Sequence, residues 1–360
     1  MNILHVTPDF NYACGRSYYV YLLLKYFSFA GNKMFLATNG GDSFDRLSEF
    51  NIPVHIIKGL KSKSMLSLTK NIKAVWDIIV NNKIDVIHSH HRYAELVSIQ
   101  AKNLLINNLP VTVMTALSIV DKKFKIEYKS DKIIAVSNSV ADMLIKKFGV
   151  NKDKIEIIPN FTDTDEIHEI EILLPIARDH GKCFNILAIG RFHHEKNFEV
   201  LLKALHRIND YEIRLILLGE GDKYIDYRTY INKHRLNVEI IVPQKNLLQY
   251  FLSSDICVLP SVRDPFPNFM LQCGLHKKPF IGANVDGIGE LIINGYNGLL
   301  FESGSDKELA EKIKLFKTDK ALANSCAQNL YSDVINNYTQ EFIIPKIKAM
   351  YARLLKSKSN

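Results

Sequence analysis

The sequence predicts an α/β protein built from two doubly wound domains, and three observations support this. The chain has 360 residues, and single domains usually hold about 100–200 residues. Short β-branched apolar runs alternate with longer helical stretches, which is typical of parallel sheets with right-handed crossovers. This alternation stops at a polar, acidic stretch and then begins again in the second half of the chain.

The first half contains short runs of strand type, most of them apolar on both faces. Strands covered by helices on both sides of a sheet have this pattern. The expected strands are residues 2–7, 34–38, 54–57, 85–88, 111–115, 132–136 and 154–158. Helices are expected at 18–29, 68–80, 94–105 and 139–148, with Ser139 as a candidate cap of the last one.

The second half repeats the pattern. Strands are expected at 184–189, 213–218, 238–242, 256–259, 279–282 and 298–301, and helices at 197–208, 247–253, 268–275, 306–316 and about 339–355. We therefore expect an N-terminal domain over residues 1–165, a linker over 166–182 and a C-terminal domain over 183–335. Residues 336–360 are expected to form a C-terminal helix that could pack back on the N-terminal domain.

Composition excludes several classes of protein. Apolar residues make up 47% and charged residues 23%, an ordinary balance that excludes bulk disorder. No apolar run reaches the roughly 18–20 residues that an integral membrane protein needs. The first six residues have the pattern of a strand rather than of a signal peptide. Five scattered cysteines without a CxxC pair indicate reduced thiols. We expect a cytoplasmic protein, with the inner face of the cell membrane as a candidate location.

The positive charge is concentrated in the N-terminal half. Residues 1–160 hold 21 Lys and Arg against 13 Asp and Glu, a net charge of +8, and the remaining 200 residues hold 25 of each. A basic half can attract a phosphorylated substrate or an anionic membrane surface, or it can be a solvated lysine-rich face. No DNA- or RNA-binding motif accompanies the charge, so nucleic acid is not an expected partner.

Two loops that follow predicted strands contain groups that could bind phosphate. In the segment 190–197, Arg191 and Lys196 flank a strand-to-helix turn and could converge on one diphosphate, with Arg as a planar fork and Lys as a movable point charge. They could equally be two surface cations. Gly15 in the loop after the first strand would let a backbone amide approach a phosphate. No GxGxxG fingerprint is present.

The segment 258–272 is the most informative. A strand ends, Pro265 and Pro267 stiffen the turn, and a helix is expected to begin near Asn268. Asp264 would precede that helix and Gln272 would lie one turn inside it, close to the free amides of the helix N-terminus. A hydroxyl-rich ligand needs such a combination of carboxylate, amide and backbone donors.

At these positions the chain resembles the retaining glycosyltransferases of family four, which have the GT-B architecture. The resemblance runs from about residue 3 to residue 301. The matching segments, in chain order, are 135–139 (AVSNS), 157–160 (IIPN), Gly190-Arg191 with Lys196, 219–221 (GEG), 260–261 (PS), 266–268 (FPN), 287–292 (GIGELI) and 297–300 (NGLL).

The resemblance implies two Rossmann-like domains that face each other across a cleft. It implies that Arg191 and Lys196 hold the diphosphate of the donor and that Gly15 approaches the phosphates from the opposite domain. The family usually has two glutamates eight positions apart, the first for the donor sugar and the second for the ribose. Those positions hold Asp264 and Gln272 here. The remaining donor-binding candidates are Gly190, Glu220, Gly221, Pro267, Asn268 and Phe269.

This sequence departs from the family pattern. Asp264 is one methylene shorter than Glu, Gln272 has lost the charge, and the glycine that usually follows the first glutamate is Pro265. Leu117 stands where similar chains often carry a histidine near the sugar.

Four residues at the end of the predicted strand 85–88 are candidates for contact with an acceptor, and the three histidines among them could instead contact the donor: His88, His90, His91 and Arg92. The histidines could instead be partly buried loop residues with no ligand role. A metal site is not expected, because no carboxylate has matching spacing.

The implied activity is transfer of a sugar from a nucleotide-diphosphate sugar to the hydroxyl of a lipid-linked or surface-polysaccharide glycan. Retention, no metal and no further cofactor are expected. The basic domain could contact an anionic membrane. Two alternatives are a catalytically silent transferase-like binding or assembly subunit and a sugar-nucleotide epimerase of the same architecture.

Overall fold

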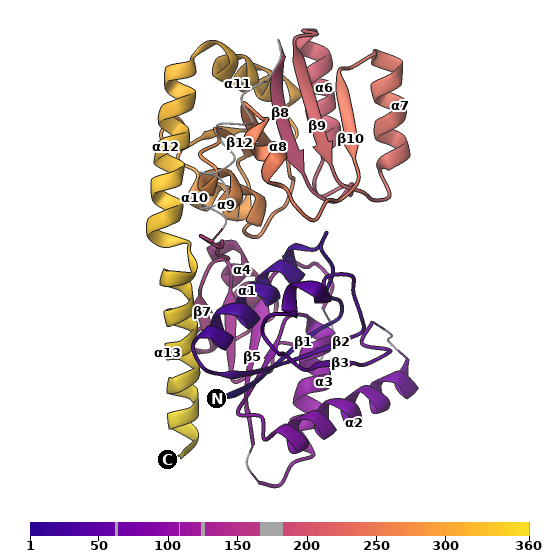
Figure 1. The fold of residues 1–360 in the computed structure, drawn as a ribbon, viewed down its shortest axis with the longest axis vertical. Helices are drawn as coiled ribbons and strands as arrows, with labels where there is room; N and C mark the ends of the chain where they lie inside the picture. Colours follow the sequence, from indigo (N-terminus) through magenta and orange to yellow (C-terminus); the bar gives the residue numbers. More distant parts are fainter. Residues whose placement is uncertain (62–63, 108, 124–126, 166–182, 360) are drawn as a thin grey trace. The chain divides into compact units, whose positions relative to one another are not determined.

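The computed structural model describes residues 1–61, 64–107, 109–123, 127–165 and 183–359. The predicted linker, residues 166–182, lies outside the described residues. Contacts divide the chain into unit 1, Met1–Asn160 with Gln340–Asn360, and unit 2, Phe161–Thr339. Each unit contains one parallel sheet (Figure 1).

Unit 1 contains a seven-stranded parallel sheet with strand order β3-β2-β1-β4-β5-β6-β7. Its strands are β1 (Asn2–Thr7), β2 (Lys33–Thr38), β3 (Val54–Ile56), β4 (Val86–Ser89), β5 (Val111–Ala116), β6 (Lys132–Ala135) and β7 (Ile155–Ile157). Every residue of β4 and β5 is buried, as expected for central strands covered on both faces.

The helices of unit 1 follow its strands in alternation. They are α1 (Gly15–Phe29), α2 (Met65–Asn82), α3 (Arg92–Asn103), α4 (Asn138–Asp142) and α13 (Gln340–Ser359), with 3₁₀ turns at Phe44–Leu47 and Lys152–Lys154. A π-helical turn, Met143–Lys147, extends α4. The cap of α4 is Ser137, which accepts the N–H of Val140, so the prediction of Ser139 as the cap was wrong.

Unit 2 contains a six-stranded parallel sheet with order β10-β9-β8-β11-β12-β13. Its strands are β8 (Phe184–Ile189), β9 (Ile213–Leu218), β10 (Val238–Ile241), β11 (Ile256–Leu259), β12 (Phe280–Ala283) and β13 (Leu299–Phe301). Its helices are α6 (Phe198–Ile208), α7 (Tyr224–His234), α8 (Leu248–Leu252), α9 (Asn268–Leu275), α10 (Asp286–Leu291), α11 (Asp306–Thr318) and α12 (Lys320–Asn337). The two sheets confirm the predicted doubly wound α/β fold.

Sequence patterning did not indicate α7 and α12. Only Tyr227 and Ile231 of α7 are buried, so its apolar stripe is thin. The buried face of α12 begins with Ala323, Cys326 and Ala327, which are small and give a weak hydrophobic period. Short apolar side chains therefore concealed a helix of 18 residues.

The last helix, α13, belongs to unit 1 and packs against α1 and β5 (Figure 1). Its buried residues include Ile343, Ile347, Met350 and Tyr351, which recur at the i, i+4, i+7, i+8 spacing of one helix face. The Tyr351 ring lies 5.3 Å from that of Phe27 on α1. The C-terminal segment is thus part of the core of unit 1.

The first prediction concerns this packing. We expect Ile347→Ala to lower the free energy of unfolding of unit 1 by about 2–5 kcal/mol, because it leaves a cavity in the core. The single tryptophan, Trp76, lies on α2 and packs against the core of unit 1. Urea unfolding followed by its fluorescence therefore reports on this unit. The exposed neighbour Lys348 provides the control, and Lys348→Ala should stay within about 0.5 kcal/mol of the wild type.

Candidate active site

The loops beyond the carboxyl ends of β8, β9, β11 and β12 form the candidate site in unit 2. In open parallel sheets, ligands bind at this edge. Strand β8 is hydrogen-bonded to both β9 and β11, and β11 to β12. The loops that begin at Gly190, Gly219, Pro260 and Asn284 therefore follow neighbouring strands.

An ion pair joins two of these loops. Lys196 Nζ lies 2.5 Å from Asp264 Oδ2, and Ser261 Oγ donates to the same oxygen at 3.1 Å. The Lys196 side chain is 24% exposed and that of Asp264 is 9% exposed. The pair is therefore partly shielded from water, where charges interact more strongly than on an open surface. The structure brings together two of the three predicted catalytic residues.

Arg191 lies on the same loop as Lys196, and its side chain is exposed. Across the described ranges, no carboxylate forms an ion pair with Arg191. The predicted convergence of Arg191 and Lys196 on one diphosphate thus stays a prediction. Both cations come from the turn that connects β8 to α6.

Glycines allow the β8 and β9 loops to touch through their backbones. A Cβ atom at Gly219 would lie 2.0 Å from the carbonyl oxygen of Gly190. One at Gly221, whose φ is +151°, would lie 2.5 Å from the carbonyl oxygen of Phe192. The backbone N–H of Phe192 donates to the backbone carbonyl oxygen of the exposed Glu220 at 2.7 Å. Contact between two loops therefore requires Gly219 and Gly221, whatever ligand binds beside them.

The helix α9 begins directly after Pro267, as the sequence predicted. Phe269 on its first turn is buried, and Gln272 is partly exposed. Asn268 and Gln272 are four residues apart, so they lie on the same face of the helix. Helix α9 and Asp264 both come after β11, and Lys196 comes after the neighbouring strand β8. All of them therefore follow the carboxyl ends of strands in the same sheet.

Comparisons with known proteins identify the family. A model described as "Glycosyltransferase Family 4" matches residues 15–166, and one described as "Glycosyl transferases group 1" matches residues 177–333. The chain is a group 1 glycosyltransferase with a family 4-like N-terminal domain. The predicted enzyme class is confirmed.

Relatives and solved structures agree. An uncharacterized glycosyltransferase of Methanocaldococcus jannaschii, MJ1178, is 24% identical, with 87% of this chain and 88% of the relative covered. The UDP-Gal:alpha-D-GlcNAc-diphosphoundecaprenol alpha-1,3-galactosyltransferase of Escherichia coli is 23% identical, with 82% of each covered. Anabaena Alr3699/HepE, solved in complex with UDP and glucose, has a TM-score of 0.81 at 17% identity, with 97% and 99% covered. The fold is GT-B, as predicted.

In unit 1 of the transferase, Gly15 is the exposed first residue of α1. His91 caps α3, where its ring accepts the N–H of Tyr93. Arg92 forms an ion pair with Glu127 and donates to the Lys122 carbonyl at 2.8 Å. The guanidinium of Arg92 thus anchors the segment after β5, and its predicted contact with an acceptor stays a prediction.

His88 and His90 lie in the core of unit 1, with 0% and 2% of their surface exposed. The two nitrogens of His88 lie 2.6 Å from the hydroxyls of Tyr351 and Thr115. This geometry does not support the prediction that these rings contact an acceptor, because neither presents a nitrogen to solvent.

A third histidine, His5, completes this cluster, and the sequence analysis missed it. His5 Nδ1 lies 2.8 Å from His90 Nε2. The signal was available in the topology, since β1 pairs with β4 and places His5 in register with His88. Ligand atoms of the three rings lie within 4.8 Å of one another, close enough to hold a metal ion. A metal at His88 would displace one of its two hydroxyl partners. The expectation of no metal stays a prediction.

Burial keeps the three rings neutral. It lowers the pKa of His5 to about 3 and lowers the pKa of His88 and His90 well below the usual value of 6.5. A neutral imidazole has one N–H and one lone pair. The network is therefore built from uncharged hydrogen bonds.

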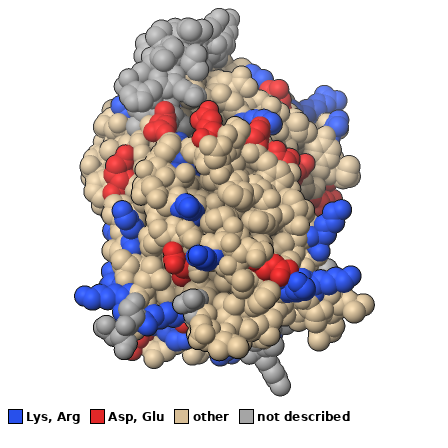
Figure 2. Space-filling model, turned by 60° about the horizontal axis from the view of Figure 1, so that its bottom comes forward, with Lys and Arg blue, Asp and Glu red and all other residues tan. Residues whose placement is uncertain are grey.

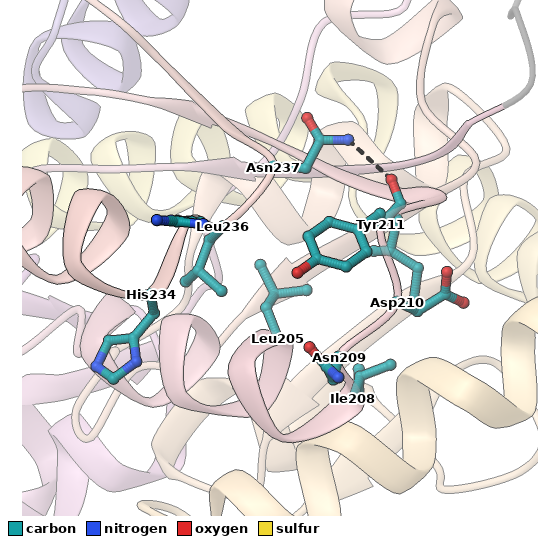
Figure 3. Close-up of a pocket in the computed structure, with 10 residues that line it drawn as sticks. Leu205, Ile208, Asn209, Asp210, Tyr211, His234, Leu236 and Asn237 are labelled. Carbon is teal, nitrogen blue, oxygen red and sulfur yellow. Dashed lines mark hydrogen bonds between the residues drawn. The ribbon is translucent and has the colours of Figure 1, made fainter.

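A pocket on unit 2 lies at the opposite edge of the sheet. Its lining includes Ile208 and Asn209 at the end of α6, His234 at the end of α7, and Tyr211 and Asn237, which precede β9 and β10 (Figure 3). These residues adjoin the amino ends of strands, where ligands of open parallel sheets do not usually bind. We assign no role in transfer to it.

No helix within the described ranges is long and apolar enough to cross a membrane.

The second prediction is a loss of stability of unit 1 in acid. Below pH 6.5 the unfolded chain binds protons at His5, His88 and His90 that the folded unit does not bind, so stability falls as pH falls. The loss is about 1 kcal/mol for each histidine between pH 6.5 and 5.5. Burial raises the pKa of Glu95, which opposes this trend. Among the described residues of unit 1, this one carboxyl is outweighed by the three histidines whose pKa burial lowers.

Urea midpoints from Trp76 fluorescence at pH 7.5, 6.5 and 5.5 provide the measurement. The exposed His206 in unit 2 is the control residue, and His206→Gln should leave the pH dependence unchanged. A midpoint that does not fall between pH 6.5 and 5.5 would contradict burial of the rings in their neutral form.

Proposed function

We propose that this glycosyltransferase moves a sugar from a nucleotide-diphosphate sugar to an acceptor hydroxyl with retention of configuration, and that unit 2 binds the donor. The observation that carries the proposal is the Lys196–Asp264 pair at the carboxyl edge of the unit 2 sheet, with the exposed Arg191 on the same loop. A cation for phosphate and a carboxylate for sugar hydroxyls are the groups that such a donor needs.

The chemistry follows from where charge develops. As the glycosidic bond breaks, negative charge builds on the β-phosphate and positive charge builds on the sugar. Arg191 and Lys196 would stabilise the departing phosphate, and preorganised charges of this kind supply a large share of catalysis. A diphosphate would compete with Asp264 for Lys196 and free the carboxylate for the sugar. Two cations on one loop can supply the charge that a metal ion otherwise provides, so we propose transfer without a metal.

We place the acceptor on unit 1 and propose a lipid-linked or surface glycan. The name of the Escherichia coli relative includes a diphosphoundecaprenol-linked acceptor, and another relative is a capsular polysaccharide biosynthesis glycosyltransferase of Staphylococcus aureus. For retention, the leaving phosphate would help to deprotonate the acceptor hydroxyl.

The third prediction tests the donor site. Arg191→Ala and Lys196→Ala should each lower the transfer rate by about 10²–10³-fold, because each removes a charge that stabilises the leaving phosphate. The rate is measured as release of nucleoside diphosphate. The control is Lys203→Ala, which removes an exposed lysine of α6 and should leave the rate unchanged.

Three outcomes would contradict the proposal. Rates of both variants within a few-fold of the wild type would exclude a diphosphate at this loop. Wild-type protein that binds nucleotide sugars but releases no nucleoside diphosphate would indicate a silent binding subunit. Conversion of the donor sugar in the absence of any acceptor would indicate an epimerase.

We also propose that the enzyme works in the cytoplasm, against the inner face of a membrane. The net charge of residues 1–160 is +8. At the start of α2, Met65 and Leu66 are 75% and 78% exposed, with the exposed Lys58, Lys61 and Lys70 nearby in the sequence. On the face drawn in Figure 2, basic side chains alternate with acidic ones and with a broad uncharged area. On this face, local basic clusters would therefore contact the lipid.

The fourth prediction is binding to anionic vesicles that weakens with salt. An anionic surface attracts each nearby lysine by about 1 kcal/mol, and salt screens that attraction. Co-sedimentation with phosphatidylglycerol vesicles should exceed that with phosphatidylcholine vesicles. The double variant Lys58→Ala/Lys70→Ala should bind less, whereas Lys233→Ala/Lys314→Ala in unit 2 should not. Equal binding to both kinds of vesicle would contradict the proposal.

A further inference from the structure

Asp286, the first residue of α10, has an unusual backbone. Its φ is +39°, in the left-handed region that side chains other than Asn, Asp and Gly rarely adopt. Glycine would adopt this backbone without strain, but the glycine of this segment is the next residue, Gly287, and the positive φ is at Asp286. Strain of this kind persists only where surrounding contacts hold it, and it occurs often at functional sites. The contacts of the Asp286 side chain therefore decide its role.

The Asp286 carboxylate holds the backbone of Asp264. Asp286 Oδ2 accepts the N–H of Asp264 at 2.9 Å, and the N–H of Gly287 donates to the carbonyl of Asp264 at 3.1 Å. Asp286 and Gly287, in the segment after β12, thus bind both the N–H and the carbonyl of Asp264, in the segment after β11. On its side-chain end, Asp264 contacts Lys196 and Ser261.

The loop that carries Asp264 lies directly on the start of α10. A Cβ atom at Gly287 would come within 2.0 Å of the carbonyl oxygen of Pro265. Pro265 and Pro267 restrict the backbone of the loop itself. The position of the loop relative to the sheet depends on its contact with Gly287. A carboxylate one methylene shorter than glutamate has little reach of its own. Its position is therefore set by the backbone that Asp286 holds.

The hydrogen bond forms at an electrostatic cost. Burial raises the pKa of Asp286, and the neighbouring charges of Asp264 and Glu290 add to this, while the amide of Asp264 and the charge of Arg263 act in the opposite direction. Two acidic residues are thus kept together, although their charges repel. Strain and repulsion together would be eliminated by glycine at 286, which fits the backbone without a carboxylate.

We propose that Asp286 is a positioning residue that fixes Asp264 at the height where its carboxylate meets the donor sugar. This inference rests on the proposed donor site. Asp286 itself need not touch the donor, and it acts through the amide of Asp264. The diphosphate, held by the loop after β8, should not depend on it.

The fifth prediction compares Asp286→Asn with Asp286→Gly. Both residues tolerate a left-handed backbone, but only Asn keeps an oxygen that can accept the N–H of Asp264. Asp286→Asn should keep kcat within about threefold of the wild type. Asp286→Gly should lower kcat by about 10–100-fold with little change in donor KM, because a displacement of about 1 Å can cost 10²-fold. Its Tm should stay close to that of the wild type, because relief of the backbone strain and of the charge repulsion offsets the lost hydrogen bond.

Nucleotide affinity separates positioning from general damage. Binding of UDP and GDP should be equal in the wild type and Asp286→Gly, and turnover is measured with UDP-glucose, UDP-galactose, UDP-N-acetylglucosamine and GDP-mannose. The matched control is Glu311→Gln, which removes an exposed carboxylate of α11 and should change nothing.

Each contrary result has a distinct meaning. If Asp286→Gly transfers sugar as fast as the wild type, the inference is wrong and the proposed function stands. A loss of UDP and GDP affinity in Asp286→Gly equal to its loss of kcat would show a structural role and overturn the inference. An equal loss of kcat in Asp286→Asn would exclude the hydrogen bond as the cause. If the wild type neither binds these nucleotides nor turns over any of the four donors, the proposed function fails, and the inference fails with it.

Discussion

The ion pair between Lys196 and Asp264 is the interaction on which the candidate site depends. It joins loops from two neighbouring strands, and it places a cation and a carboxylate 2.5 Å apart at one edge of a sheet. Neither loop could hold this geometry alone, because a lysine side chain is flexible and the carboxylate lies on an irregular segment. Ser261 donates to the carboxylate of Asp264, and Asp286 at the start of α10 accepts the backbone N–H of the same residue, so that the pair is partly built before any ligand arrives.

Close backbone contacts support this pair. Gly219 and Gly221 allow the β9 loop to lie on the β8 loop, and Gly287 allows α10 to lie on the β11 loop. Each contact would be lost with any side chain at the glycine. The glycine-rich loops of unit 2 therefore serve the assembly of the site's walls, and this role exists independently of any direct approach to phosphate. Positions that look like ligand contacts in the sequence can thus be contacts between loops.

Unit 1 uses polar groups differently. His5 and His90 are hydrogen-bonded to each other, and His88 packs against both rings and is hydrogen-bonded to the hydroxyls of Thr115 and Tyr351. Tyr351 lies on α13, 263 positions further along the chain than His88. Burial that lowers the pKa of these rings keeps them uncharged, so the network costs no desolvated charge. It links the last helix to the first and fourth strands, which makes the end of the chain part of the core of unit 1.

The sequence by itself determined the two doubly wound sheets and the glycosyltransferase class, because apolar strands covered on both faces and motifs in a fixed order are local features. It also placed Lys196, Asp264 and the start of α9 correctly in their loops. Tertiary structure alone decided that Lys196 pairs with Asp264, that His5 lies in register with His88, and that Asp286 holds Asp264. Each of these contacts depends on which strands are neighbours and on how closely their loops approach. The spacing of residues within one segment of the sequence encodes neither of these two properties. Helices α7 and α12 were missed for a related reason: their buried faces are thin or made of small residues, and only the helices that they pack against, α6 for α7 and α9 for α12, show which face is buried.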